Sequence, residues 1–130
     1  MSATGVTSRG RRAAERLMVD RCDIGRPGEP VTDPETGKVT VPVEPVYSGR
    51  CKLQGRSAWP STPDAGDHAW TLVTIEVHIP ATTTGVRTGD IVEITRSIDP
   101  TNLGRRFLVK SADLATFRTA VRLLVEEVTG

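Results

Sequence analysis

The stretch TLVTIEVHI, residues 71–79, alternates apolar and polar side chains, and this pattern constrains the fold more than any other feature of the chain. Its apolar residues are Val73, Ile75, Val77 and Ile79. Because successive side chains of a strand point to opposite faces, the alternation predicts a β-strand with one buried face. Such half-buried strands are typical of antiparallel sheets that enclose or cover a core.

Comparable short runs recur along the chain between segments rich in turn-forming residues. They predict strands over residues 21–26, 46–54, 71–79, 91–97, 105–112 and 119–128. The side chains expected to face inward are Cys22, Ile24, Tyr47, Cys51, Leu53, Val92, Ile94, Phe107, Val109, Val121, Leu123 and Val125. The pattern indicates a mainly β fold, a small antiparallel β-barrel or sandwich of about six strands with a short N-terminal helix and long loops.

The helix is expected over about residues 8–18, where apolar residues recur at helical spacing, with Ser8 as a possible N-cap. The residues with this spacing are Ala13, Ala14, Leu17 and Met18. Residues 1–7 are small and polar and are expected to be flexible. A chain of 130 residues supports one hydrophobic core, so residues 8–130 are predicted to form a single barrel domain.

Two longer segments interrupt the strands. Residues 27–45 are proline-rich and carry a strong turn signal at 33–37, which predicts a hairpin-like excursion at the edge of the sheet. Residues 55–68 show little periodicity and predict a long loop. The sequence leaves two roles open for Trp59 in that loop: it could pack as a lid on the domain, or it could contact a partner.

The charge of the chain is balanced overall but uneven along its length. Lys and Arg number 17 against 16 Asp and Glu, a formal net charge of +1, which argues against binding DNA through bulk electrostatics. The start of the chain is nevertheless basic, with Arg9, Arg11, Arg12 and Arg16 close together. These arginines form either a solvated helix face or a surface that docks on acidic protein or lies near DNA.

Residues that could support catalysis or metal binding are few. His68 and His78 have no partner at metal-ligand spacing, and both are expected to be solvated. Asp64 and Asp67 beside His68 could imitate a hydrolytic cluster, but no nucleophile motif accompanies them. We therefore expect no enzymatic activity, no metal and no cofactor.

The cysteines and the hydropathy suggest a protein of a reducing compartment. Cys22 and Cys51 are too few for a disulfide scaffold or a zinc site and are expected to behave as small core residues. No stretch approaches the roughly 18 apolar residues that span a bilayer. We expect a soluble protein without membrane contact, made in a cytoplasm.

The phrases VYSGRCKLQ (46–54) and SIDPTNLGRRFLV (97–109), together with the order of elements from about Arg11 to Val128, resemble a known group. The chain is similar to the head-to-tail connector proteins of tailed phages of actinobacteria, in the stopper or head-closure class. That resemblance implies a small β-barrel with a helix and long loops. It also implies a structural virion protein at the head–tail junction, assembled in the host cytoplasm and acting without a cofactor.

The same resemblance implies a set of partners. Copies would form a homo-oligomeric ring, twelvefold like the portal, between the portal-adaptor proteins and the tail terminator or tail tube proteins. The ring would close the DNA channel and support tail attachment, while genomic DNA passes through its lumen without sequence-specific binding. A tail-terminator protein and an OB-like nucleic-acid-binding barrel stay open as alternatives. The OB-like barrel is disfavoured because Tyr47, Phe107 and Phe117 are dispersed and expected to face inward.

Contacts with these partners are expected from the basic helix, from the long loop and from the turn that precedes residues 105–112. Gly104 is expected at a positive φ in that turn, which places the two following arginines at the rim of the barrel, within reach of a neighbouring subunit. The candidate interface residues are Arg9, Arg11, Arg12, Arg16, Trp59, Asp64, Asp67, Arg105 and Arg106.

Overall fold

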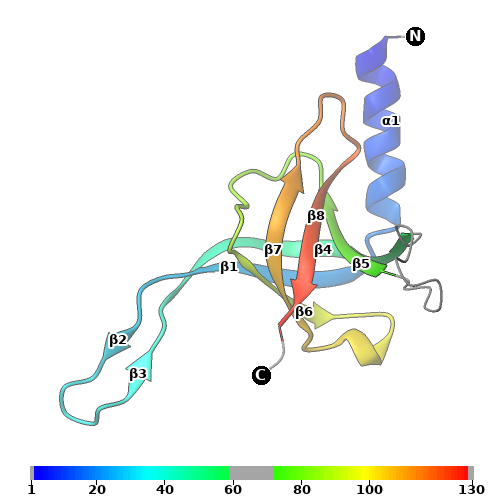
Figure 1. Cartoon of the computed structure of the whole chain (residues 1–130). Coiled ribbons are helices and arrows are strands. Elements are labelled where there is room, and N and C mark those ends of the chain that lie inside the picture. Colours follow the sequence, from blue (N-terminus) through cyan, green and yellow to red (C-terminus); the bar gives the residue numbers. More distant parts are fainter. Residues whose placement is uncertain (1, 59–71, 129–130) are drawn as a thin grey trace, which may run out of the picture.

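In the computed structural model, residues 2–58 and 72–128 are described, and within them one α-helix precedes a closed barrel of β-strands (Figure 1). The elements are α1 (Ala3–Arg16), β1 (Asp20–Pro27), β2 (Val31–Thr32), β3 (Val39–Thr40), β4 (Val43–Ala58), β5 (Leu72–Pro80), β6 (Ile91–Arg96), a 3₁₀ helix (Pro100–Asn102), β7 (Arg106–Asp113) and β8 (Ala120–Glu127). The predicted mainly β fold is confirmed, and of the two architectures left open it is the barrel.

The barrel closes because β1 is paired along both of its edges. Its strand order is β1-β4-β5-β8-β7-β6, every neighbouring pair is antiparallel, and β6 returns to pair with β1. On β1 the register shifts between Ile24 and Gly25 toward β4, and between Arg21 and Cys22 toward β6. Such bulges bend a strand and increase its twist, which small barrels need in order to close.

The core is built from small and branched side chains. The fully buried set comprises Cys22, Ile24, Cys51, Val77, Ile79, Val92, Ile94, Phe107, Val109, Val121 and Leu123. Phe107 is the largest of them, and Tyr47 and Leu53 pack against the cluster from partly buried positions. The predicted inward faces of all six barrel strands are therefore confirmed for the described residues.

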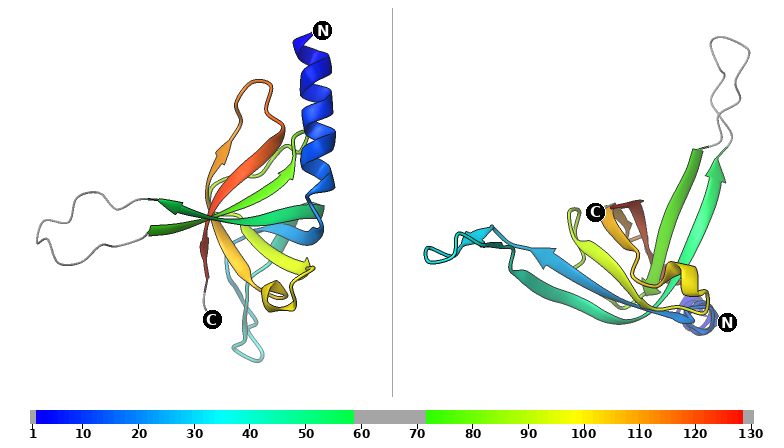
Figure 2. Two further views of the ribbon diagram at one scale, coloured as in Figure 1. Left: turned by 90° about the vertical axis from the view of Figure 1, so that its right-hand side faces the viewer. Right: turned by 90° about the horizontal axis from the view of Figure 1, so that it is seen from below.

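Beyond the barrel wall, β1 and β4 continue into a hairpin that we call the arm, residues 27–45 (Figure 2). The predicted excursion is confirmed. At its tip the Asp33 side chain accepts a hydrogen bond from the Glu35 amide at 2.9 Å, and Gly37 adopts a φ of 72°. All arm residues are exposed, so none of the arm's own side chains is buried.

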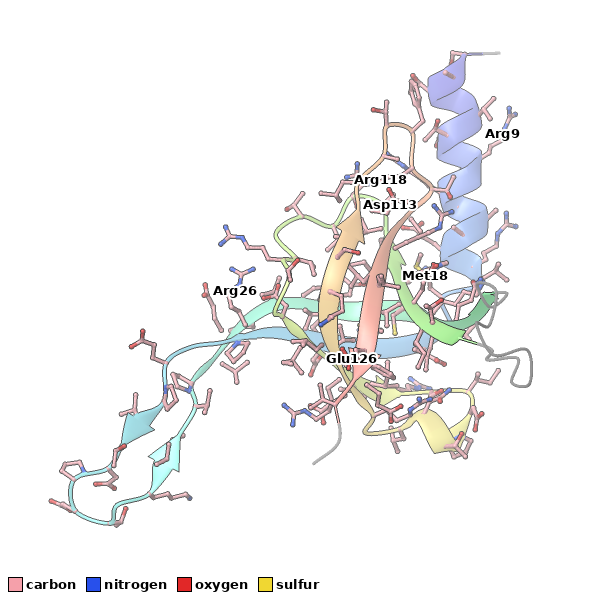
Figure 3. The ribbon with its side chains drawn as sticks, viewed as in Figure 1. Arg9, Met18, Arg26, Asp113, Arg118 and Glu126 are labelled. Carbon is pink, nitrogen blue, oxygen red and sulfur yellow. The ribbon has the colours of Figure 1, made fainter. Side chains whose placement is uncertain are left out.

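The arm is tied to the barrel at a buried carboxylate. Asp90, 1% exposed, accepts hydrogen bonds from Arg26 Nε at 3.0 Å and from the Arg87 amide at 2.8 Å. Arg26, on β1 at the root of the arm, also donates to the Gly85 carbonyl at 2.7 Å (Figure 3). One guanidinium thus links the base of the arm to the connection between β5 and β6.

The helix differs from its prediction at the N-terminal end. It begins at Ala3 rather than near Ser8, because Ser2 is the N-cap and its side chain accepts a hydrogen bond from the Gly5 amide at 3.1 Å. Residues 3–7 are therefore helical, and the helix is longer at this end than the sequence predicted. The missed residues 3–7 include Gly5 and two threonines, which have low helix propensity, and Val6 alone shows no helical spacing of apolar residues.

Contacts between α1 and the barrel are made by one face of the helix. A Cβ on Gly10 would lie 2.7 Å from Cγ2 of Thr119, so a glycine is required for this close approach. Arg11 Nε donates to the Arg118 carbonyl at 3.1 Å, and Met18, just past the helix, is buried against the barrel end. Leu17, predicted on the same apolar face, is instead 59% exposed.

The predicted loop over residues 55–68 is also corrected at its start. Strand β4 runs as far as Ala58 and pairs with β5 from Lys52↔His78 to Ala58↔Leu72. Residues 55–58 are thus part of a second hairpin that extends past the barrel. The remainder of the predicted loop lies outside the described residues.

The Asp90 link provides a test of what anchors the arm. We expect Asp90→Ala to lower the free energy of unfolding by about 2–3 kcal/mol, because the Arg87 amide and Arg26 lose their acceptor in a buried place. Denaturant unfolding would measure the loss. In Glu126→Gln, which removes an exposed pair with Lys110 at 3.3 Å, the change should stay within about 0.5 kcal/mol. Equal losses in the two variants would contradict the anchoring role.

The two thiols provide a test of the barrel interior. Cys22 and Cys51 are free and completely buried. The hydrogen bond between the two thiols and burial raise the pKa of the Cys22 thiol, which keeps it protonated. We expect a thiol-reactive dye to label the native protein at least about a hundredfold more slowly than the unfolded chain. Thr40→Cys, on the exposed arm, should label at once, whereas rapid native labelling of Cys22 and Cys51 would contradict a closed barrel.

Candidate interaction surfaces

Three arginines of α1 gather at one cavity, and Figure 3 shows Arg9, one of them, pointing away from the barrel. At 3.6 residues per turn, Arg9, Arg12 and Arg16 share one helical face. They line a shallow cavity of about 610 Å³ together with Glu15 and with Arg50 of β4. We call Arg9, Arg12, Arg16 and Arg50 the arginine face; it gathers four of the cations into one exposed region.

Arg11, also predicted as an interface residue, lies on another side of α1. Its guanidinium donates to the Arg118 carbonyl at 3.1 Å, and Arg118 Nε in turn donates to the carbonyl of Ala81 at 3.0 Å. The side chain is half-buried. Arg11 therefore fastens the helix to the connection between β7 and β8, and it is separate from the arginine face.

An apolar groove of about 800 Å³ lies where the arm leaves the barrel. Its apolar lining includes Pro27, Val41, Val43, Pro45 and Ile91, and its charged lining residues are Asp23, Glu93 and Arg106. Arg106 is exposed here, as predicted for a rim arginine. The groove offers a partner an apolar floor with charges of both signs.

Arg105 behaves differently from Arg106 although the two are adjacent. Its Nε donates to Glu127 Oε1 at 3.2 Å, and its Nη1 donates to the Asn102 side chain at 2.8 Å. The guanidinium also lies 5.1 Å from the ring centroid of Phe107. These contacts hold Arg105 within its own chain, joining the turn before β7 to the end of β8.

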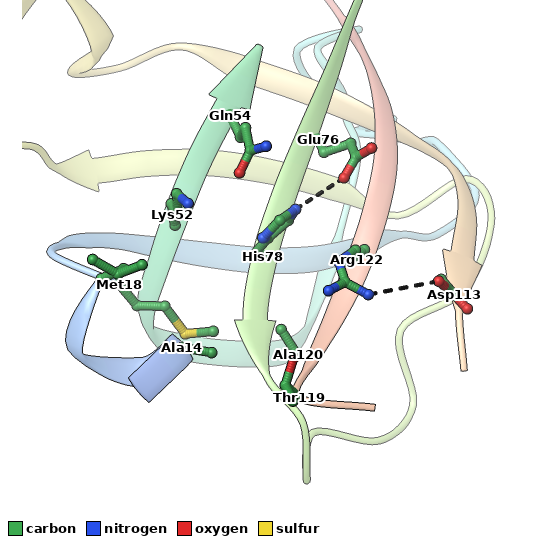
Figure 4. A pocket seen from close by; sticks show the side chains of 11 residues that line it. Ala14, Met18, Lys52, Gln54, Glu76, His78, Asp113, Thr119, Ala120 and Arg122 are labelled. Atoms are coloured by element: carbon green, nitrogen blue, oxygen red, sulfur yellow. Dashed lines mark hydrogen bonds and ion pairs between the residues drawn. The ribbon is translucent and has the colours of Figure 1, made fainter. Parts of the chain in front are cut away.

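A polar pocket of about 590 Å³ lies between α1 and the outer face of the strands (Figure 4). Its lining includes His78 and Glu76 of β5, Lys52 of β4 and Arg122 of β8. His78 Nε2 lies 2.9 Å from Glu76 Oε2, and both side chains are only 12% exposed. The expectation of a solvated His78 is wrong, because α1 and its neighbours cover that part of the polar strand face.

The polar pocket mixes acids, bases and a histidine, and its contacts include the His78–Glu76 pair within β5 and an ion pair between neighbouring strands. Arg122 Nη1 lies 3.9 Å from Asp113 Oδ2 across β8 and β7. Among the residues that the structure describes, no group of three or more His, Cys, Asp and Glu side chains could hold a metal ion. Nor does any helix in that part of the chain have the length and apolar character to cross a membrane.

Comparison with known protein families finds one that matches most of this sequence. A family described as "Family of unknown function (DUF6093)" matches residues 10–126, which include nearly the whole barrel, the arm and the end of α1. The chain belongs to DUF6093. No curated protein matches the sequence.

Of the predicted interface residues in this DUF6093 chain, the structure brings Arg9, Arg12 and Arg16 together and places Arg106 apart from them at the groove. Trp59, Asp64 and Asp67 lie outside the described residues. His68 and Trp70 lie outside them as well.

Sequence reasoning missed several exposed apolar residues at the tips of connections. Phe117, expected inward, is 58% exposed at a φ of 58°, and Leu114 in the same β7–β8 connection is 59% exposed. Ile98 and Leu103 are exposed around the 3₁₀ helix at Pro100–Asn102. Leu114 and Phe117 lie outside any stretch that alternates apolar and polar residues, and this could have indicated from the sequence that they are exposed.

The Arg105–Glu127 pair predicts a pH-dependent contribution to stability. The hydrogen bonds from Arg105 hold the pKa of Glu127 below its usual value. A depressed carboxyl pKa stabilises the fold above the unfolded-state value of about 4.3, and this is lost as the pH falls through the folded-state pKa. Glu127→Gln should therefore lower Tm at neutral pH, with a gap to wild type that closes in acid.

Thermal melts of both proteins between neutral and acidic pH would measure this gap. Glu126→Gln, one residue earlier and 68% exposed at its side chain, is the matched control and should leave Tm close to wild type. A Tm gap for Glu127→Gln that stays constant across the acidic range would contradict the assignment.

Proposed function

We propose that this DUF6093 chain is a structural virion protein of the phage neck, a head-to-tail stopper. Its copies would form a ring between the portal-adaptor complex and the tail, close the DNA channel and support tail attachment. The observation that carries the proposal is the arm, residues 27–45, which leaves a closed barrel and is exposed along its whole length. A hairpin of two strands gains little stability alone in water, so a persistent one is suited to a partner surface.

Barrel closure adds to this argument. Each of the six barrel strands has a neighbouring strand on both sides, since β6 pairs with β1, although β4 pairs with β1 over Val43–Cys51 and with β5 over Lys52–Ala58. Addition of a neighbour's strand to a free edge is therefore not available to these strands along their paired lengths. Subunits would instead associate through protruding segments and side-chain surfaces, as in a ring of rigid bodies.

The two phrases that carry the resemblance fall on separate parts of the molecule. VYSGRCKLQ lies within β4 and supplies buried Cys51, whereas SIDPTNLG forms the connection with the 3₁₀ helix. Ile98 on that connection is 77% exposed, which suits a contact with a neighbouring ring. The proposed partners are the portal-adaptor proteins on one side and the tail terminator or tail tube on the other.

Electron microscopy of the virion neck, with this chain traced in the density, tests the proposal directly. We expect a homo-oligomeric ring, twelvefold if it matches the portal, between the portal-adaptor complex and the tail, with genomic DNA passing through its lumen. Density for this chain at the end of the tail tube, within the tail structure, would identify a tail terminator instead. Its absence from the head–tail junction would overturn the proposal.

The arginine face favours one second candidate, an OB-like nucleic-acid-binding barrel. Guanidinium groups suit phosphates, and such a surface would bind single-stranded DNA with a strong dependence on salt. Among the described residues stacking platforms are sparse: Phe107 is buried, the Tyr47 hydroxyl donates to the Arg50 carbonyl at 2.7 Å, and Phe117 is the one exposed phenylalanine ring. We expect only weak binding that disappears at physiological salt, and tight binding there would favour the second candidate.

A further inference from the structure

We propose that the arm of one subunit docks along the arginine face of α1 of a second copy, so that copies join head to tail. This inference rests on the proposed function and deepens it, because it names the surfaces by which neighbouring ring subunits meet. The arm and α1 lie on opposite sides of the barrel in both Figure 1 and Figure 2. A contact between two different surfaces of the same chain is heterologous, the type that builds rings.

The two surfaces carry opposite charge. The arm has four carboxylates and one lysine, a formal charge of −3: Glu29, Asp33, Glu35, Glu44 and Lys38. Helix α1 has four arginines and one carboxylate, a formal charge of +3: Arg9, Arg11, Arg12, Arg16 and Glu15. Such complementarity steers association and selects one orientation of the partners.

Within the part of the chain that the structure describes, most charged side chains of these two surfaces form no ion pair. Arg12 and Arg16 are exposed and form no ion pair there, and the carboxylates of Glu29 and Glu35 likewise have no basic partner. Arm and helix of one chain face away from each other, so they do not neutralise one another. In the proposed contact, the arm carboxylates of one copy pair with the α1 arginines of a second copy.

Apolar side chains accompany the charges on both surfaces. Val31, Val39, Val41 and Val43 on the arm are between 46% and 61% exposed. Val6 of α1 and Leu17, just past the end of the helix, are 52% and 59% exposed. Covering these residues would remove apolar surface from water on both copies, which supplies the non-directional part of the affinity.

The surfaces are also similar in length. The arm extends for about seven residues on each side of its tip, which at 3.3 Å per residue gives roughly 23 Å. Helix α1 has 14 residues, which at 1.5 Å per residue gives roughly 21 Å. An arm laid along a neighbouring helix would therefore span it, and would meet its arginines over residues 9–16 in the C-terminal half of the helix.

Two reciprocal charge reversals test this contact. The first variant, Glu29→Arg with Glu35→Arg, makes the arm basic, and the second, Arg12→Glu with Arg16→Glu, makes the helix acidic. None of these side chains is buried or holds the fold together. The control exchanges an exposed pair elsewhere, Lys110→Glu with Glu126→Lys, and leaves the net charge unchanged.

Self-association of the full chain would be measured by sedimentation velocity at an ionic strength of about 0.01 M, where the Debye length is about 30 Å. We expect wild type and control to associate, and each reversed variant alone to associate at least about tenfold more weakly. An equimolar mixture of the reversed variants should associate again, with the two chains alternating in native mass spectra. This follows because each basic arm then meets an acidic helix and each acidic arm a basic helix.

Several outcomes would overturn the contact: a wild type that stays monomeric, reversed variants that associate normally, or a mixture that does not recover. If Arg12→Glu with Arg16→Glu abolishes only DNA binding, the arginine face serves nucleic acid and the contact is wrong. If the mixture associates again but the chain is absent from the virion neck, the proposed function is wrong and the contact between arm and helix is still supported. If the chain forms a ring in the virion neck but the mixed variants do not associate, the proposed function is supported and the contact between arm and helix is wrong.

Discussion

The pairing of β6 with β1 is the constraint on which the rest of the structure depends. It turns a sheet into a closed barrel, so that every barrel strand finds a hydrogen-bonding neighbour on each side. The strands are longer than the closed part, however, and β1 and β4 must continue beyond it as the arm. Closure of the barrel therefore determines which parts of the strands form the rigid barrel and where β1 and β4 leave it as the arm.

Closure also explains the composition of the interior. A six-stranded barrel has room for few large side chains, and here Phe107 is the one ring among the fully buried residues of the described chain. Cys22 and Cys51 occupy neighbouring positions on β1 and β4 and act as small apolar fillers. Arg105 then covers the region near Phe107 from outside, held by Glu127 of the adjoining strand.

The barrel was predictable from the sequence because each strand follows a period of two with its own buried face. From Cys22 on β1 to Val125 on β8, the inward residues follow from that alternation alone. The prediction failed where tertiary contact overrides local pattern. His78 belongs to a polar face, yet α1 covers it, and no local signal encodes where a distant helix will pack.

The candidate surfaces were predictable only in part, for a similar reason. Adjacent arginines look equivalent in a sequence, but Arg105 finds Glu127 on the next strand whereas Arg106 points to the groove. In the helix, three of four predicted arginines share a face because 3.6 residues per turn bring positions 9, 12 and 16 together. Arg11 falls on another side of the helix and bonds to the Arg118 carbonyl.

The balanced total charge has a different meaning once the fold is known. A net charge of +1 suggests a surface with little electrostatic preference, but the sum conceals an acidic arm and a basic helix on opposite sides of one rigid barrel. Charges separated in this way repel like surfaces of two copies and attract unlike ones, which favours a single direction of assembly. In the proposed assembly each pair of opposite charges would lie inside a contact, which would leave the assembled surface close to neutral. A ring built on such contacts would present DNA with a wall that does not hold its phosphates, and this is compatible with passage through a channel.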